Sequence, residues 1–168
     1  MPLEEFAMTT LRSNNIFIRH AVATLAYRAA KVLRRAPADF SEFRVSETSR
    51  SAGQILAHMC DLLDWALSQA RGKQRWRNSK PRTWTEDSER FFGALAAFDE
   101  YLASGEKLHE PPEKIFQGAV ADALTHTGQI AMLRRLAGAR VRGENYFLAK
   151  IETGRTGADQ NRAVSEFN

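Results

Sequence analysis

The chain has 168 residues, and its 24 lysines and arginines against 20 aspartates and glutamates give a formal net charge of +4. This length suits one domain with a substantial core, since most domains span ~100–200 residues. The single cysteine, Cys60, excludes an internal disulfide framework and a cysteine-based metal cluster, and it fits a reducing compartment.

The first residues and the hydropathy of the chain indicate where in the cell we expect the protein. The opening segment, MPLEEFAMTT, lacks the basic and apolar regions of a signal peptide. No uninterrupted apolar run approaches the ~20 residues of a membrane-spanning helix. We therefore expect a soluble, cytoplasmic protein with no membrane partner.

The first half of the chain predicts two amphipathic helices. One, at about 13–35, begins at the candidate N-cap Ser13, and its apolar residues recur at steps of three and four. The second, at about 51–72, begins with Ser51 and Gln54, which have the spacing of a capping box. Each helix has one apolar stripe to bury.

The second half predicts two more helices. One, at about 85–104, follows another capping-box pair, Thr83 and Glu86. The last, at about 112–137, starts at a proline pair and ends at Gly138, a residue type that commonly terminates helices. No segment predicts a convincing strand.

These elements predict an all-α fold. Four amphipathic helices of roughly 20 residues, joined by moderate loops, favour a four-helix bundle over residues 1–138. Residues 139–168 predict an irregular C-terminal tail that packs on the bundle, with an end that is free to move. Its apolar island includes Tyr146 and Phe147, which could roof a pocket.

Ionisable residues interrupt the apolar stripes of two predicted helices. In the last helix the stripe includes Asp122 and His126, and their spacing of four places both side chains on one face. His58 has a similar position in the second helix, between Ile55 and Leu62. If these two faces meet in the bundle, two imidazoles and one carboxylate converge.

A divalent metal would offset the cost of burying these three groups. A buried polar group without a partner costs ~1–3 kcal/mol, and an ionised carboxylate costs more. Imidazole and carboxylate are suitable ligands for Zn²⁺, Ni²⁺, Mn²⁺ or Fe²⁺, and three protein ligands leave positions for water or substrate. The alternative is a structural dyad, in which Asp122 pairs with His126 and no metal binds.

Other polar residues have weaker support. Asp61, three residues after His58, is a candidate catalytic base or an orienting partner for that histidine, and the alternative is a solvated helix carboxylate. Gln129 could bind a ligand or a loop, or be structural. His20 and His109 lie among polar residues or in a loop, so we expect both at the surface.

Two segments resemble the DinB/YfiT-like superfamily of metal-dependent four-helix-bundle proteins. Its members have a histidine on the second helix and an H-x-x-x-H motif on the fourth, typically followed by Gly-Gln. GQILAHMCDLLDWAL is similar to the former, with His58 at its histidine. DALTHTGQI is similar to the latter, with His126 at its final histidine and Gly128-Gln129 following. The resemblance covers about residues 13–138, but Asp122 stands in place of the first histidine of the motif.

The resemblance implies a divalent metal cofactor at His58, Asp122 and His126. It also implies a hydrolase or a low-molecular-weight thiol transferase acting on an unknown small molecule, with a thiol as one option, and a homodimer. An aspartate makes the ligand set harder, and it could lower metal affinity or leave Asp122 outside direct coordination. The alternative is a non-catalytic binding or stress-response bundle whose metal site is vestigial.

The densest basic segment is RGKQRWRNSKPRTW, residues 71–84. Interleaved basic and aromatic residues can hold phosphates and stack on unpaired bases, which would suit a nucleic acid. The favoured interpretation is a solvated helix end and loop, since basic residues suit the negative end of the preceding helix. A nucleic-acid partner is therefore the weaker expectation.

Overall fold

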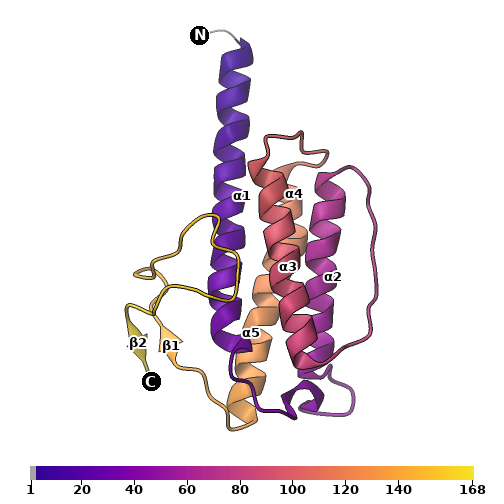
Figure 1. The fold of residues 1–168 in the computed structure, drawn as a ribbon, viewed down its shortest axis with the longest axis vertical. Coiled ribbons are helices and arrows are strands. Elements are labelled where there is room, and N and C mark those ends of the chain that lie inside the picture. The colour runs from indigo at the N-terminus through magenta and orange to yellow at the C-terminus, as the bar shows by residue number, and fades with distance from the viewer. Residues whose placement is uncertain (1–2) are drawn as a thin grey trace.

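The computed structural model describes residues 3–168, with side chains from residue 15 onward. The fold is predominantly helical, as predicted, and its longer helices lie side by side (Figure 1). In this part of the chain the helices of 16 or more residues are α1 (Leu3–Leu33), α2 (Ala52–Ala70), α3 (Trp84–Ala103) and α5 (Ala121–Leu136). None of the described helices is long and apolar enough to cross a membrane.

Capping boxes begin α2 and α3, and both were predicted. At α2 the Gln54 backbone N–H donates to Ser51 Oγ at 3.3 Å, and the Ser51 N–H donates to Gln54 Oε1 at 2.8 Å. At α3 the Glu86 and Thr83 backbone N–H groups make the same reciprocal bonds, at 3.3 and 3.0 Å. Each box satisfies two backbone donors that a helix start leaves without partners.

The predicted start of the first helix is wrong. The helix α1 begins at Leu3, so Ser13 lies within it and does not cap it. The residues before Ser13 are mostly good helix formers and include no proline or glycine after Pro2, so nothing in them stops the helix. The helix ends at Leu33, and Arg35 then adopts φ 54° as the chain turns toward a short 3₁₀ turn at Phe40–Glu42.

The fourth predicted helix is divided. It consists of α4 (Pro112–Ile115), a π-helical turn (Phe116–Val120) and α5. A π-helical turn inserts extra backbone into the helical ladder and re-aims the residues that follow. The predicted end is confirmed, since α5 stops at Leu136 and Gly138 adopts the left-handed φ of 75°.

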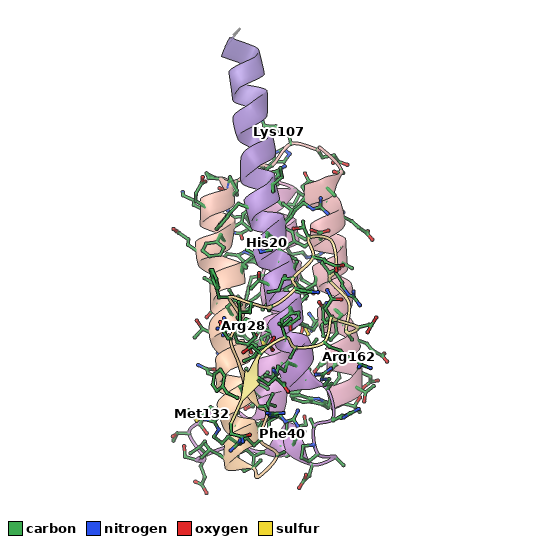
Figure 2. All side chains as sticks on the ribbon, turned by 90° about the vertical axis from the view of Figure 1, so that its left-hand side faces the viewer. His20, Arg28, Phe40, Lys107, Met132 and Arg162 are labelled. Carbon is green, nitrogen blue, oxygen red and sulfur yellow. The ribbon has the colours of Figure 1, made fainter. Side chains whose placement is uncertain are left out.

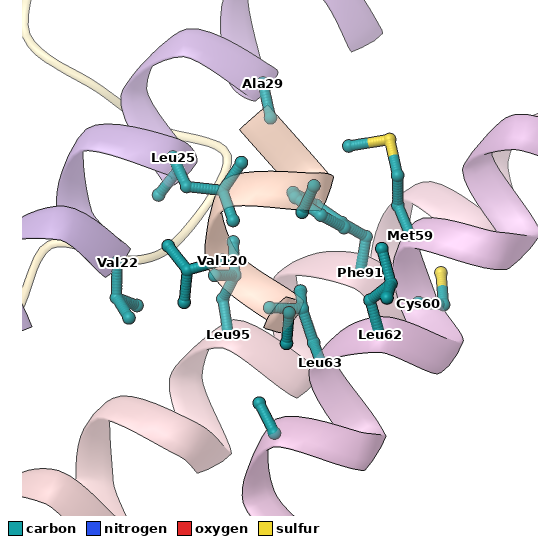
Figure 3. Close-up of a cluster of buried hydrophobic side chains, with 14 of the residues drawn as sticks. Val22, Leu25, Ala29, Met59, Cys60, Leu62, Leu63, Phe91, Leu95 and Val120 are labelled. Carbon is teal, nitrogen blue, oxygen red and sulfur yellow. The ribbon is translucent and has the colours of Figure 1, made fainter. Parts of the chain in front are cut away.

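The core lies between the long helices (Figure 3). Leu25 from α1, Leu63 from α2, Phe91 from α3 and Val120 from the π-helical turn meet there, all fully buried. Cys60 also lies in this core. Its thiol donates to the Asp87 carbonyl at 3.3 Å, and burial raises the thiol pKa to about 12.

The C-terminal segment contains a short pair of strands that the sequence did not predict. The strands β1 (Gly143–Glu144) and β2 (Glu166–Phe167) are antiparallel. Lys31 of α1 bridges them, since its Nζ lies 2.7 Å from a carboxylate oxygen of Glu144 and 2.7 Å from one of Glu166. Two-residue strands have no alternation that a sequence pattern could reveal.

The predicted apolar island docks only in part. Tyr146 packs edge-on against Tyr27 with ring centroids 6.3 Å apart, and the Arg28 guanidinium lies 4.4 Å from the Tyr146 ring centre. Phe147 is 94% exposed. The segment lies over the face of α1 that carries His20 and Arg28 (Figure 2). Tyr146 is therefore held by α1, and the predicted roof over a pocket is not formed by this segment.

Candidate metal centre

His58 of α2 and the pair Asp122 and His126 of α5 come together where these two helices pack. His58 Nε2 lies 3.5 Å from Asp122 Oδ2, and His126 Nε2 lies 3.5 Å from Asp122 Oδ1. One ligand atom from each of the three residues lies within 4.8 Å of the others. The group that the sequence singled out could therefore hold a metal ion.

The distances between these atoms can be compared with those expected for the alternative, a structural pair of Asp122 and His126 that binds no metal. The 3.5 Å separations between imidazole nitrogens and carboxylate oxygens are longer than the about 2.7–3.2 Å of a well-formed N–H···O hydrogen bond. Ligand atoms at ~2.0–2.2 Å from a tetrahedral zinc ion are about 3.3–3.6 Å apart. The two distances end on different oxygens of Asp122, so they fit an ion pair as well as a ligand set, and the distance that covers all three residues is the 4.8 Å bound.

Helix geometry positions the three side chains. Asp122 is the second residue of α5, just after the π-helical turn and Ala121, and His126 lies one turn further along α5. The two imidazoles are 18% and 11% exposed, whereas the Asp122 carboxylate is 45% exposed. The ring centroids of His58 and His126 are 4.9 Å apart and the rings are nearly perpendicular. The group is therefore open to solvent on the side of Asp122.

The surroundings of His58 favour its neutral form. Burial lowers the pKa of His58, its neighbours Arg50 and His126 lower it further, and Asp122 opposes these effects. An imidazole must be neutral to coordinate a metal. His58 is thus held near neutral pH in the state that a ligand requires.

Gln129 orients His126. The Nδ1–H of His126 donates to Gln129 Oε1 at 2.7 Å. This bond places the proton on Nδ1 and leaves the lone pair of Nε2 directed at the side of Asp122. Partners of this kind fix the tautomer and ring orientation of metal-ligating histidines. The sequence left the role of Gln129 open, and the structure assigns it to His126.

Trp76 covers His58, a contact that sequence reasoning missed. Its ring centroid lies 5.6 Å from that of His58 and 5.8 Å from that of Trp65, edge-on in both cases. Trp76 belongs to the basic connection 71–83 between α2 and α3, and the indole remains 48% exposed. Trp76 was visible in the sequence, but the path of the loop was not.

Asp61 is buried and already bonded. Its oxygens accept hydrogen bonds from the backbone N–H and the hydroxyl of Ser79, both at 2.7 Å, and from Arg90 at 2.6 Å. Burial would raise the pKa of Asp61, but the hydrogen bonds from Arg90 and Ser79 outweigh it and lower the pKa. The solvated-carboxylate alternative is wrong, because Asp61 is 2% exposed. Its role as a base stays a prediction.

Two hollows flank the three ligand residues. One, of about 700 Å³, is lined by His126 and Gln129 together with apolar side chains, and the other, of about 330 Å³, is lined by His58 and Asp61 with the Ser79 loop. These volumes are in the range of small-molecule sites, about 300–1,000 Å³. Arg50 lines both hollows.

The other two histidines lie elsewhere, as predicted. His20 is exposed on α1, with its Nδ1 3.3 Å from the Thr153 hydroxyl. His109 is exposed in the connection that precedes α4. Neither belongs to the ligand group.

Comparison of the chain with protein-family models, with curated proteins and with solved structures finds no match. The support for the metal centre is therefore the geometry of His58, Asp122 and His126 and of the side chains around them.

Proposed function

We propose that this chain is a metal-binding four-helix bundle of the DinB/YfiT-like type, with one divalent ion held by His58, Asp122 and His126. The observation that carries the proposal is the convergence of one ligand atom from each of His58, Asp122 and His126 to within 4.8 Å of one another. Metal sites built from side chains on facing helices are common in helix bundles. The side-by-side packing of α2 and α5 supports this assignment.

The ligand chemistry limits the choice of ion. Two imidazoles and one carboxylate suit Zn²⁺, Ni²⁺, Mn²⁺ and Fe²⁺, and the absence of a thiolate from the set disfavours softer ions. Three protein ligands leave at least one position for water or substrate. The 45% exposure of the Asp122 carboxylate gives that position access from solvent.

The proposed reaction is either hydrolysis of a small molecule or transfer of a low-molecular-weight thiol to one. When bound, a divalent ion supplies Lewis acidity that lowers the pKa of a water or a thiol. The negative charge of Asp122 weakens this effect relative to three neutral imidazoles. Gln129 keeps the His126 lone pair directed into the site, and Trp76 shields one side of His58 from water.

Metal content of purified variants tests the proposal. We expect about one divalent ion per chain in the wild-type protein after incubation with Zn²⁺, Ni²⁺, Mn²⁺ or Fe²⁺ and removal of the excess, measured by elemental analysis. His58→Ala and His126→Ala should each lose the ion. His20→Ala and His109→Ala are matched controls, since both remove an exposed histidine outside the site.

The outcome also separates the two readings of the bundle. Full retention of metal in His58→Ala and His126→Ala contradicts the proposed site. A wild-type protein that binds none of the four ions, with a melting temperature that none of them changes, supports the non-catalytic binding bundle instead.

A further inference from the structure

Two cationic side chains lie beside the ligand group. Arg50 and Lys80 both line the hollow that contains His58, and Arg50 also lines the hollow that contains His126. Both are exposed, and among the described side chains neither forms an ion pair. Their positive charges are therefore available to a ligand.

Contacts of neighbouring residues fix the backbone at both cations, whose side chains are exposed. Arg50 directly precedes Ser51, whose capping box fixes the start of α2. Lys80 directly follows Ser79, whose N–H and hydroxyl are bonded to Asp61 of α2. Arg50 therefore lies at the start of α2, the helix that carries His58. Lys80 comes after α2 in the chain and lies beside it because Ser79 contacts Asp61.

The smaller hollow has an excess of positive charge. Its one carboxylate, Asp61, is paired with Arg90 at 2.6 Å. Arg90 also pairs with Asp64 at 2.8 Å, but the hollow itself is lined by two cations and one carboxylate, and neither Arg50 nor Lys80 forms an ion pair among the described side chains. A small anion is the ligand that such a hollow favours, since charge-assisted hydrogen bonds to carboxylate or phosphate are stronger than neutral ones.

The larger hollow is mainly apolar. Ile55, Met132 and Leu133 line it beside His126. Met132 lies on the outer side of α5 and is 56% exposed (Figure 2). A mainly apolar lining with a few polar groups is typical of small-molecule sites.

We propose that the site takes a small organic anion with an apolar body. Its carboxylate or phosphate lies between Arg50 and Lys80, and its apolar part lies over Ile55, Met132 and Leu133. The molecule thereby spans His58 and His126. This inference names the substrate class of the proposed metal centre and rests on that proposal. The binding of the anion itself depends only on Arg50 and Lys80.

Binding of matched probes tests the inference. The probes are 3-phenylpropionate, phenyl phosphate and the neutral 3-phenylpropan-1-ol, titrated calorimetrically at low salt into metal-free and zinc-treated protein. We expect at least one anion to bind about tenfold more tightly than the alcohol, and to weaken as salt is added. Arg50→Gln and Lys80→Gln should each weaken the anion about tenfold and leave the alcohol unchanged.

Two exposed cations of the same loops supply controls. Arg44→Gln and Lys73→Gln remove charges that line neither hollow, so anion affinity should not change. Met132→Ser should weaken the binding of 3-phenylpropionate and leave that of inorganic phosphate, added as a fourth probe, unaffected. The arm with the better affinity, carboxylate or phosphate, identifies the charged group.

Several results would overturn the inference. They are equal affinity for the anions and the alcohol, no binding of any probe at millimolar concentration, or equal losses in the controls and in Arg50→Gln and Lys80→Gln. Equal losses for a single-stranded oligonucleotide in Lys73→Gln and Lys80→Gln, with no binding of the small anions, would assign the basic segment to nucleic acid instead.

Metal content measured on the same samples separates the two proposals. Retained metal with no selectivity for anions overturns the inference and leaves the metal centre intact. Anion binding that depends on Arg50 and Lys80 in a protein that holds no metal supports the anion site and contradicts the proposed metal centre.

Discussion

The hydrogen bond from His126 to Gln129 sets the protonation pattern of the candidate metal centre. With Nδ1 donating to Oε1 at 2.7 Å, only Nε2 has a lone pair for an ion. Gln129 is exposed and directed at His126, so it contributes little to the core. A change at this position should therefore affect the metal site more than the fold.

Gln129→Leu should lower metal affinity about tenfold, since loss of such orienting partners typically costs 10–100-fold. A competition titration against a chromophoric chelator measures this, and thermal unfolding of the metal-free protein should show little change. Gln129→Glu is the matched control, because its carboxylate still accepts from Nδ1 and affinity should be retained. Unchanged affinity in Gln129→Leu would contradict the assigned role.

The ligand residues could be predicted from sequence because helical periodicity determines their placement. Asp122 and His126 share a face whatever the rest of the fold does, and His58 needs only the packing of two apolar stripes. The contacts of Trp76 and Asp61 depend on the path of the connection 71–83, which no periodicity describes. In the folded protein, the hydrogen bonds from Ser79 to Asp61 and the contact of Trp76 with His58 fix that path.

At the scale of elements, Arg134 of α5 holds the end of α1. Its guanidinium donates to the carbonyl oxygens of Val32, Arg34 and Arg35 at 2.9, 2.7 and 3.0 Å, and to that of Ala139 at 3.1 Å. A helix end leaves its last carbonyls without intrahelical partners, and a buried cation there also suits the helix dipole. Arg134 is 6% exposed, so water cannot readily replace it.

Arg134→Met should lower the free energy of unfolding by about 3 kcal/mol, because buried carbonyls lose their donors. Arg135→Met is the matched control: its side chain is exposed, and a change there should lie within about 0.5 kcal/mol of the wild type. Urea unfolding of the metal-free variants gives both values. Equal effects of the two substitutions would show that the carbonyl contacts of Arg134 contribute no special stability.

Element boundaries were predictable where a local signal determines them. The Ser51–Gln54 and Thr83–Glu86 pairs mark the starts of α2 and α3, because each box satisfies its own backbone donors. The start of α1 has no such signal, and the π-helical turn depends on tertiary packing. An added Cβ at Gly118 in that turn would lie 3.6 Å from the Trp65 ring, so α2 contacts the turn closely.

At the scale of the whole molecule, the candidate metal centre joins two helices that are far apart in the chain. His58 is on α2, and Asp122 and His126 are on α5. The unfolded chain does not bring these groups together, so a metal that binds them binds mainly the native state. By linkage, the ion then stabilises the fold in proportion to its affinity and free concentration.

Added Zn²⁺ should raise the melting temperature of the wild-type protein. At a free concentration of 100 times Kd, the gain is about 2.7 kcal/mol, or about 5–10 °C for a domain of this size. His58→Ala should remove the increase, and His109→Ala should retain it. Differential scanning calorimetry with and without Zn²⁺ measures the effect, and an equal increase in His58→Ala would exclude the proposed site as its source.

The stability of the metal-free protein should also depend on pH, and the direction of this dependence follows from the pKa of His58. Burial, Arg50 and His126 lower its pKa in the folded protein, against an opposing effect of Asp122. Between this lowered pKa and the ordinary value near ~6.5, the unfolded chain therefore binds more protons, and stability rises with pH. This contribution of His58 is fully present above ~6.5 and is lost as pH falls through the lowered folded pKa.

The stabilisation by Zn²⁺ should depend on pH as well, because the ion needs neutral imidazole. The increase in melting temperature should be larger at pH 7.5 than at pH 5.5. Equal increases at both pH values would show that the ion binds groups other than these histidines.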